Sequence, residues 1–215
     1  MNKKKIDIKL IKCVFLTLLF QLLLTSISYK VSKHYKVLSK IKLDTTPALV
    51  SFIVTQLLIV FIVILYINSE ISKNEKYGFH KRFAVFVAWS LYIGCLLSIY
   101  DNTSKVKAVL IQLLILWTLC LSLSFYLSLT DTLDFESLRK YYIVLFLTFA
   151  VFECIYIILF MKQHKGFHIV SVLLSLLSTA ISTNDLVKKK QTCLQGSFQF
   201  YTELIDLFQK LYKLD

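Results

Sequence analysis

QGSFQFYTELIDLFQKLYKL, residues 195–214, is the stretch that decides how this chain folds. Its polar side chains recur at steps of three and four residues: Gln199, Glu203, Asp206, Lys210 and Lys213. Its apolar side chains recur at similar steps on the opposite side: Phe200, Leu204, Leu207, Phe208, Leu211 and Leu214. These are helical periods. The sequence therefore predicts an amphipathic helix over about 195–213, with one polar and one apolar face.

The chain before this helix has the composition of an integral membrane protein. Hydrophobic residues make up 57% of its 215 residues, with four glycines and one proline, and the mean hydropathy is +0.67. Apolar runs of about the length that crosses a bilayer recur along it. We expect an all-α integral membrane protein, a single domain over 1–215 with seven hydrophobic helices. Its six spans are predicted at about 11–29, 47–67, 83–100, 108–129, 141–161 and 169–183.

The net charge of +12 lies almost wholly in the connections between these spans. We interpret it as membrane topology, and the Lys/Arg distribution favours a cytosolic N-terminus. The predicted surroundings are thus a lipid bilayer. Nucleic acid is not an expected partner, because no soluble segment combines a basic run with interleaved aromatic residues.

The cysteines do not indicate a metal or redox site, since neither a CxxC motif nor a Cys/His cluster is present. Cys13, Cys95, Cys120 and Cys154 fall in apolar segments, where single cysteines are usually inert small hydrophobes. Cys193 follows the lysines at 188–190 near a membrane surface. Palmitoylation is possible there, but a plain structural cysteine is favoured.

The acids of the last helix constrain where it lies. A central Asp, Lys or Arg in a spanning helix costs roughly 2.5–3.5 kcal/mol on insertion scales. The helix therefore either lies in the membrane interface with its polar face to water, or inserts with its polar stripe toward other helices or a water-filled cavity. Periodicity leaves both arrangements open. Asp206 and Lys210, four residues apart with the acid first, are predicted to form a helix salt bridge.

Glu203 is the acid that matters most for function. A carboxyl group in a dry site holds its proton more tightly, and a second carboxyl nearby strengthens this effect. Such a pair, once deprotonated, offers the carboxylate oxygens that a hard cation such as calcium prefers. Asp185, at the end of the sixth span, is the expected partner from another element. Glu153 is a second intramembrane acid, for which a protonated, hydrogen-bonded role is equally open.

Several segments resemble the Bax inhibitor (transmembrane Bax inhibitor motif) family. GSFQFYTELIDLFQKLYKL is similar to its C-terminal signature: Tyr201, Leu207, Phe208 and Lys213 fall in register, and Glu203 and Asp206 take the aspartate and asparagine places. IKCVFLTLLFQLLLTSIS looks like the first span of the family, and Asp134, Phe135 and Ser137 look like its motif after the fourth span. The resemblance is collinear over nearly the whole chain.

The resemblance implies a fold in which six spans surround the central C-terminal helix. It implies a pH-sensitive calcium leak in endoplasmic reticulum or Golgi membranes that suppresses apoptosis by lowering stored calcium. The proton-sensing pair carried over would be Glu203 and Asp185, which would also be the candidate calcium ligands. No cofactor is implied beyond calcium as the transported ion, and apoptosis-regulating membrane proteins are possible partners.

Three departures from the family pattern bear on this gate. Strict register places Thr183, and not Asp185, at the aspartate of the sixth span. The family's basic residue in the second span is missing between Pro47 and Ile67, and Glu203 is one methylene longer than aspartate.

The alternative function is a non-conducting membrane protein that inhibits cell death through helix contacts with other proteins. We do not expect an enzyme, because no HExxH motif, Ser/His pair or glycine-flanked aspartate pair occurs in a plausible setting. The predicted cytosolic N-terminus argues against a receptor of the G-protein type.

Overall fold

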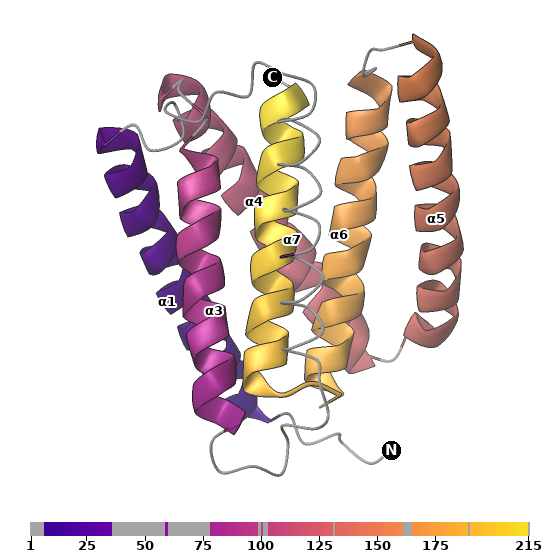
Figure 1. The fold of residues 1–215 in the computed structure, drawn as a ribbon. Helices are drawn as coiled ribbons and strands as arrows, with labels where there is room; N and C mark the ends of the chain where they lie inside the picture. Colours follow the sequence, from indigo (N-terminus) through magenta and orange to yellow (C-terminus); the bar gives the residue numbers. More distant parts are fainter. Residues whose placement is uncertain are drawn as a thin grey trace. The chain divides into compact units, whose positions relative to one another are not determined.

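The part of the chain that the computed structural model describes is all helical (Figure 1). It comprises residues 7–35, 59, 78–98, 100, 103–130, 132–160, 165–188 and 190–214, and the side chains of residues 78–81, 103, 154, 157–160 and 165 are not described. Within these residues there are six helices: α1 (Ile8–His34), α3 (Gly78–Leu97), α4 (Thr103–Thr130), α5 (Phe135–Phe160), α6 (Lys165–Val187) and α7 (Cys193–Leu214). The span predicted over 47–67, which would be the seventh helix, lies outside the described residues.

Each described helix coincides with a predicted one and extends beyond it at one or both ends. The apolar run marks only the part of a helix suited to hydrocarbon, whereas the helix continues until its backbone groups are capped. α5 illustrates this, since it begins at Phe135 and not near 141. Asp134 caps it: one carboxylate oxygen accepts the backbone N–H groups of Glu136 (3.0 Å) and Ser137 (3.3 Å), and the other accepts the Ser137 hydroxyl (2.6 Å). The motif that resembled the family is thus an N-cap.

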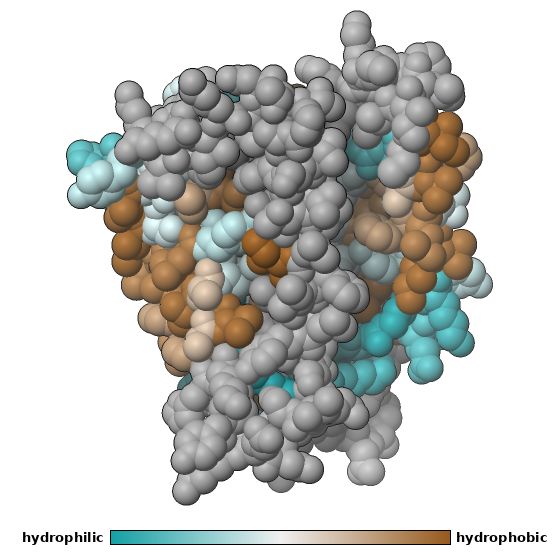
Figure 2. Space-filling view, in the orientation of Figure 1, coloured by the Kyte–Doolittle hydropathy of each residue, from teal (hydrophilic) through white to brown (hydrophobic). Residues whose placement is uncertain are grey.

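Three of the described helices are long and apolar enough to cross a membrane: α1, α4 from Ser104, and α6 from Gly166. Large apolar side chains also remain exposed along α5, as Figure 2 shows for that side of the molecule. They include Tyr141, Val144, Leu147, Val151 and Phe152. Hydrophilic residues gather at the end where α5 begins. Such a continuous exposed apolar surface is typical of a lipid-facing helix.

The chain divides into two compact units. The N-terminal unit, residues 14–101, contains most of α1 together with α3. These helices approach closely around Gly94, where an added Cβ would lie 2.7 Å from the Ser28 Cβ. Hydroxyl groups of α1 bond backbone carbonyls of α3: Thr25 donates to Ser90 (3.2 Å) and Ser28 to Leu91 (2.5 Å). Small residues and hydroxyl bonds of this kind are how membrane helices associate.

The C-terminal unit, residues 1–13 and 102–215, contains the start of α1 and helices α4 to α7. α7 packs on α6 and α4, and α5 packs on α6. The predicted apolar face of α7 is buried, as Phe200, Leu204, Leu207, Phe208 and Leu211 show. The prediction of an amphipathic helix is therefore confirmed.

A disulfide bond joins Cys13 at the start of α1 to Cys193 at the start of α7. The interpretation of Cys13 as an inert single cysteine is therefore wrong, and Cys193 has no free thiol to be palmitoylated. The two residues are 180 positions apart in the sequence, and pairing at such separation cannot be deduced from a sequence alone. Cys95 and Cys120 are free, as expected.

Candidate functional site

A seam of polar side chains runs between α6 and α7 within the C-terminal unit. On α6, serines stand at positions 171, 175, 178 and 182, at steps of four, three and four. On α7, positions 199, 203, 206 and 210 hold Gln, Glu, Asp and Lys at the same steps. Equal helical spacing places one polar group of each helix opposite one of the other along the contact. The polar face of α7 is therefore directed at α6, at least over this length.

Glu203 lies at the middle of the seam and is only 8% exposed. Its Oε1 accepts hydrogen bonds from the hydroxyls of Ser178 (3.0 Å) and Ser182. Its Oε2 is buried and has no hydrogen-bond partner among the described residues. Gln199, one turn earlier, donates its side-chain amide to the Ser182 hydroxyl oxygen (2.6 Å). Glu203 is thus held by neutral hydroxyl donors, with one oxygen left over.

Asp206 and Lys210 form the salt bridge that their spacing predicted. The Ser175 hydroxyl donates to the same Asp206 carboxylate oxygen (2.5 Å), and the Lys210 ammonium also donates to the Ser175 hydroxyl (2.7 Å). Lys210 further reaches the backbone carbonyl of Ser171 (3.3 Å). Asp206 therefore carries its own counter-charge, together with a hydroxyl from α6.

Asp185, the predicted partner of Glu203, has a different neighbour. Arg139, in the first turns of α5, donates a guanidinium nitrogen to both carboxylate oxygens of Asp185. The Asp185 side chain is 11% exposed and that of Arg139 is 40% exposed. Asp185 follows Ser182, the donor to Glu203, by three residues on α6, so the two acids lie in the same region. Each nevertheless has its own partners in this structure.

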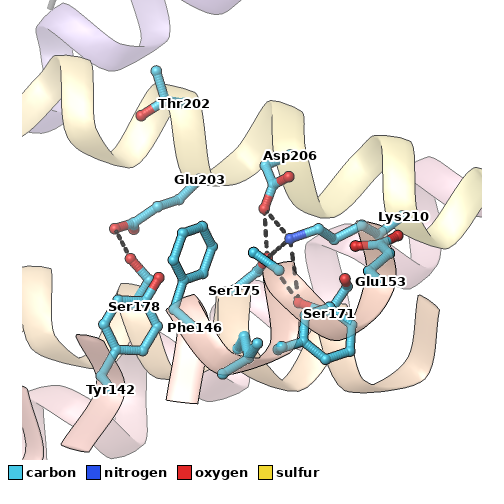
Figure 3. A pocket seen from close by; sticks show the side chains of 13 residues that line it. Tyr142, Phe146, Glu153, Ser171, Ser175, Ser178, Thr202, Glu203, Asp206 and Lys210 are labelled. Carbon is cyan, nitrogen blue, oxygen red and sulfur yellow. Dashed lines mark hydrogen bonds and ion pairs between the residues drawn. The ribbon is translucent and has the colours of Figure 1, made fainter. Parts of the chain in front are cut away.

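A cavity of about 390 Å³ opens beside the seam, between α5, α6 and α7 (Figure 3). Glu203, Asp206 and Glu153 all line it, so three of the four predicted site residues share one cavity and Asp185 does not. The other lining residues combine hydroxyl groups with aromatic rings: Ser171, Ser175, Ser178, Thr202, Tyr142, Phe146 and Phe149, together with Ala150, Leu174 and Lys210. Figure 3 shows Glu203 directed toward Ser178, with Asp206 and Lys210 grouped around Ser175.

The described residues include no group of three or more His, Cys, Asp or Glu side chains arranged to hold a metal ion. Glu203 and Asp185, named from the sequence as possible calcium ligands, therefore form no closed ligand shell with a third such residue there. What the cavity offers is acidic oxygen at a polar, partly open place. Such a place suits a cation that passes through or binds with part of its hydration.

Sequence reasoning missed two parts of this site. Arg139 lies outside the span predicted at 141–161, because hydropathy detects only the apolar part of α5. The serines of α6 were hidden inside an apolar run, although their steps of four, three and four match those of the α7 stripe and could have identified the contact.

Thr183, which takes the family's aspartate position in strict register, is fully buried. It bonds the carbonyl of Thr179 on its own helix (2.7 Å).

Comparison of the chain with protein-family models, with curated proteins and with solved structures found no match.

Proposed function

We propose that this protein is a pH-sensitive calcium leak channel of intracellular membranes, in the endoplasmic reticulum or the Golgi, that inhibits apoptosis. We further propose that it is related to the Bax inhibitor family, on the segments quoted above. The observation that supports the proposal most directly is Glu203. This buried carboxyl group, on an amphipathic helix, lines a polar cavity, and one of its oxygens has no hydrogen-bond partner among the described residues.

The chemistry of Glu203 suits a gate that responds to protons. An ionised carboxylate in a buried place costs several kcal/mol unless a cation accompanies it. Ser178 and Ser182 offset part of this cost by donating to Oε1. The charged form adds one negative charge beside the cavity that Glu203 lines, which favours a cation there, whereas the protonated form adds none. We expect cation flux to rise as the pH rises and Glu203 loses its proton.

The test is calcium flux from liposomes that contain the purified protein, between pH 6 and 8. Glu203→Gln keeps the size and the acceptor oxygen but removes the charge, so we expect flux to lose its pH dependence. Glu136→Gln is the matched control, because Glu136 is exposed at the start of α5 and does not line the cavity. Unchanged flux in Glu203→Gln at equal incorporation would contradict the proposal.

A second candidate is a non-conducting membrane protein that inhibits cell death through helix contacts with other membrane proteins. One observation favours it: Asp185 is bound to Arg139, so the two acids of the supposed gate each have other partners. Under this function, Glu203→Gln would leave protection of cells from death unchanged, and no leak would be measured at any pH from protein shown to be folded.

A further inference from the structure

We propose that the disulfide between Cys13 and Cys193 is a reversible redox switch, which opens and closes in the glutathione pool of the cytosol and changes how the start of α7 is held. Cys13 lies in the second turn of α1, and Cys193 is the first residue of α7. The proposal rests on the predicted cytosolic N-terminus and does not depend on calcium conduction.

The compartment of the disulfide is the first argument. Cys13 lies near the start of α1, so the bond lies at the end of this helix that carries the N-terminus. The Lys/Arg distribution predicts this end in the cytosol. Glutathione and thioredoxin keep cytosolic thiols reduced, and the disulfides that do form there are mostly transient and catalytic or redox-sensing. A reversible bond therefore fits the predicted topology, whereas a permanent structural bond does not.

The bond is open to a thiol from the aqueous side. Cys13 is exposed and Cys193 is half-buried, so an incoming thiolate reaches the Cys13 sulfur more easily. The exposed lysines Lys12, beside Cys13, and Lys190, three residues before Cys193, mark the water-facing ends of the two segments. Lys9 precedes Cys13 by one helical turn and is also exposed. Such cations stabilise thiolates, which are both the attacking and the leaving species in disulfide exchange.

Reduction of the bond takes two exchange steps. A glutathione thiolate attacks the Cys13 sulfur, forms a mixed disulfide there and expels the Cys193 thiolate, which takes a proton from water. A second glutathione thiolate attacks the glutathione sulfur of the mixed disulfide, and the Cys13 thiolate leaves and is protonated. Two glutathione thiols are thereby oxidised to one disulfide, and the protein disulfide is reduced to two thiols. Oxidised glutathione closes the bond by the reverse steps.

The start of α7 has its own cap, which does not depend on the disulfide. The backbone N–H of Gln195 donates to the Thr192 hydroxyl oxygen (3.4 Å), and the backbone N–H of Thr192 donates to the Gln195 side-chain oxygen (3.2 Å). This reciprocal pair is a capping box. Opening the disulfide should therefore leave the helix wound and remove only the covalent link between its first residue and the start of α1.

A series of hydrogen bonds connects the segment beside Cys193 with the seam between α6 and α7. Gln191, two residues before Cys193, donates its side-chain amide to the side-chain oxygen of Gln199 (2.6 Å). Gln199 donates to the Ser182 hydroxyl oxygen (2.6 Å), and this hydroxyl donates to Glu203. A displacement of the start of α7 would act on the first of these bonds. We therefore expect reduction to loosen the first turns of α7 where they meet α6.

The first experiment measures the state of the bond and requires no variant. Full-length protein in nanodiscs is equilibrated in glutathione buffers that run from oxidising to as reducing as the cytosol. Free thiols are alkylated, the remaining disulfide is reduced and labelled with a second reagent, and mass spectrometry measures both labels on Cys13 and Cys193. The two cysteines should change together from oxidised to mostly reduced across this range. A pair that stays oxidised in the most reducing buffer would be structural and would overturn the proposal.

The second experiment determines which side of the membrane carries the disulfide. A protease is added to sealed microsomes that contain the protein with a tag at its N-terminus. Removal of the tag places the disulfide at the cytosolic side, as the proposal requires. A tag that is protected until detergent opens the vesicles places the bond in an oxidising compartment, where it would stay closed, and overturns the proposal.

The third experiment asks whether α7 responds to reduction, with Trp117 of α4 as the reporter. Its ring lies edge-on to that of Phe200 on α7, with the centroids 6.2 Å apart. The chain has two tryptophans, so Trp89→Phe leaves Trp117 alone. Dithiothreitol should shift the emission of this protein, and should not shift that of the matched Trp89→Phe, Cys193→Ser control, in which the bond is already absent.

Unchanged Trp117 emission in protein whose disulfide is shown to be reduced would refute the switch, because the bond would then open without effect on α7. Circular dichroism checks that the control variant is folded. Calcium flux is not a readout in any of these experiments, so failure of the proposed leak leaves their result unaffected.

Discussion

Removing the guanidinium of Arg139 tests the arrangement of charge around Asp185. The Asp185 side chain is 11% exposed, whereas that of Arg139 is 40% exposed. Arg139→Gln would therefore leave a buried carboxylate without its cation. Breaking a fully buried pair in this way lowers the free energy of unfolding by about 3–5 kcal/mol. Breaking an exposed pair lowers it by about 0–1 kcal/mol. Because one partner is buried and the other reaches solvent, we expect a loss of about 2 kcal/mol.

Removing the charge of Asp185 in place of Arg139 is expected to lower the free energy of unfolding less. Asp185→Asn removes the buried charge and leaves Arg139 at a place where water reaches it, so the loss should be at most about 1 kcal/mol. In an Asp185→Asn background, Arg139→Gln should add almost nothing, since the carboxylate that needed it is gone. The asymmetry between the two single variants follows from the two exposed fractions and would not arise from a symmetric surface pair.

Thermal unfolding in nanodiscs, followed by far-ultraviolet circular dichroism, measures these differences. For a chain of this size about 1 kcal/mol shifts the midpoint by roughly 2–4 °C, so Arg139→Gln should lower it by about 4–8 °C. Lys140→Gln, a neighbouring exposed cation on the same helix, is the control and should change it little. The reasoning is refuted if Arg139→Gln acts like Lys140→Gln, or if its effect persists when Asp185 is already Asn.

Three further predictions concern the capping, packing and cross-linking of the helices. Hydrogen bonds from the Ser137 hydroxyl and backbone N–H, with a further one from the Glu136 backbone N–H, lower the pKa of Asp134 below its ordinary 3.8. The stabilisation of α5 by Asp134 is therefore present above pH 3.8 and is lost as the pH falls through the folded-state pKa. The melting temperatures of the unmodified chain and of Asp134→Asn should thus differ at pH 7 and converge in acid. Gly94→Ala should lower the free energy of chemical unfolding by up to about 2 kcal/mol. A crowded Cβ costs about 1–3 kcal/mol, whereas the gain in helix propensity is at most about 1 kcal/mol. A more stable variant would contradict the close approach of α1 and α3. Cys193→Ser should lower stability by roughly 2–4 kcal/mol and abolish the difference in mobility between reduced and non-reduced protein on a gel.

The course of the described helices could be predicted from the sequence because their signals are local. The two stripes of α7 lie within a single run of twenty residues, and their steps determine both the helix and its faces. The same steps placed Glu203, Asp206 and Lys210 on one face, and the structure shows the salt bridge expected of the last two.

The partners of these residues could not be predicted, because they come from elements distant in the sequence. Arg139 reaches Asp185 only because α5 starts at Phe135, six residues before the apolar run begins. That start depends on the cap at Asp134, which a hydropathy average does not detect. The disulfide between Cys13 and Cys193 depends in the same way on where the two helix ends meet.

Glu153 offers a test of the charge argument for the proposed calcium leak. Asp185 and Asp206 each have a cation, on Arg139 and Lys210 respectively, so their ionisation adds no net charge to the site. Among the described residues, Glu203 accepts hydrogen bonds from neutral hydroxyls and has no ion pair, so its ionisation adds one negative charge. A calcium ion beside that single charge leaves a positive excess unless a second carboxylate contributes.

Glu153 is the remaining acid that lines the cavity and is half-buried. Glu153→Gln should therefore reduce calcium flux several-fold. Flux from liposomes measures this at equal incorporation, with Glu136→Gln as the control. If calcium flux is unaffected, a divalent ion does not need the second carboxylate, and the charge argument fails for the leak.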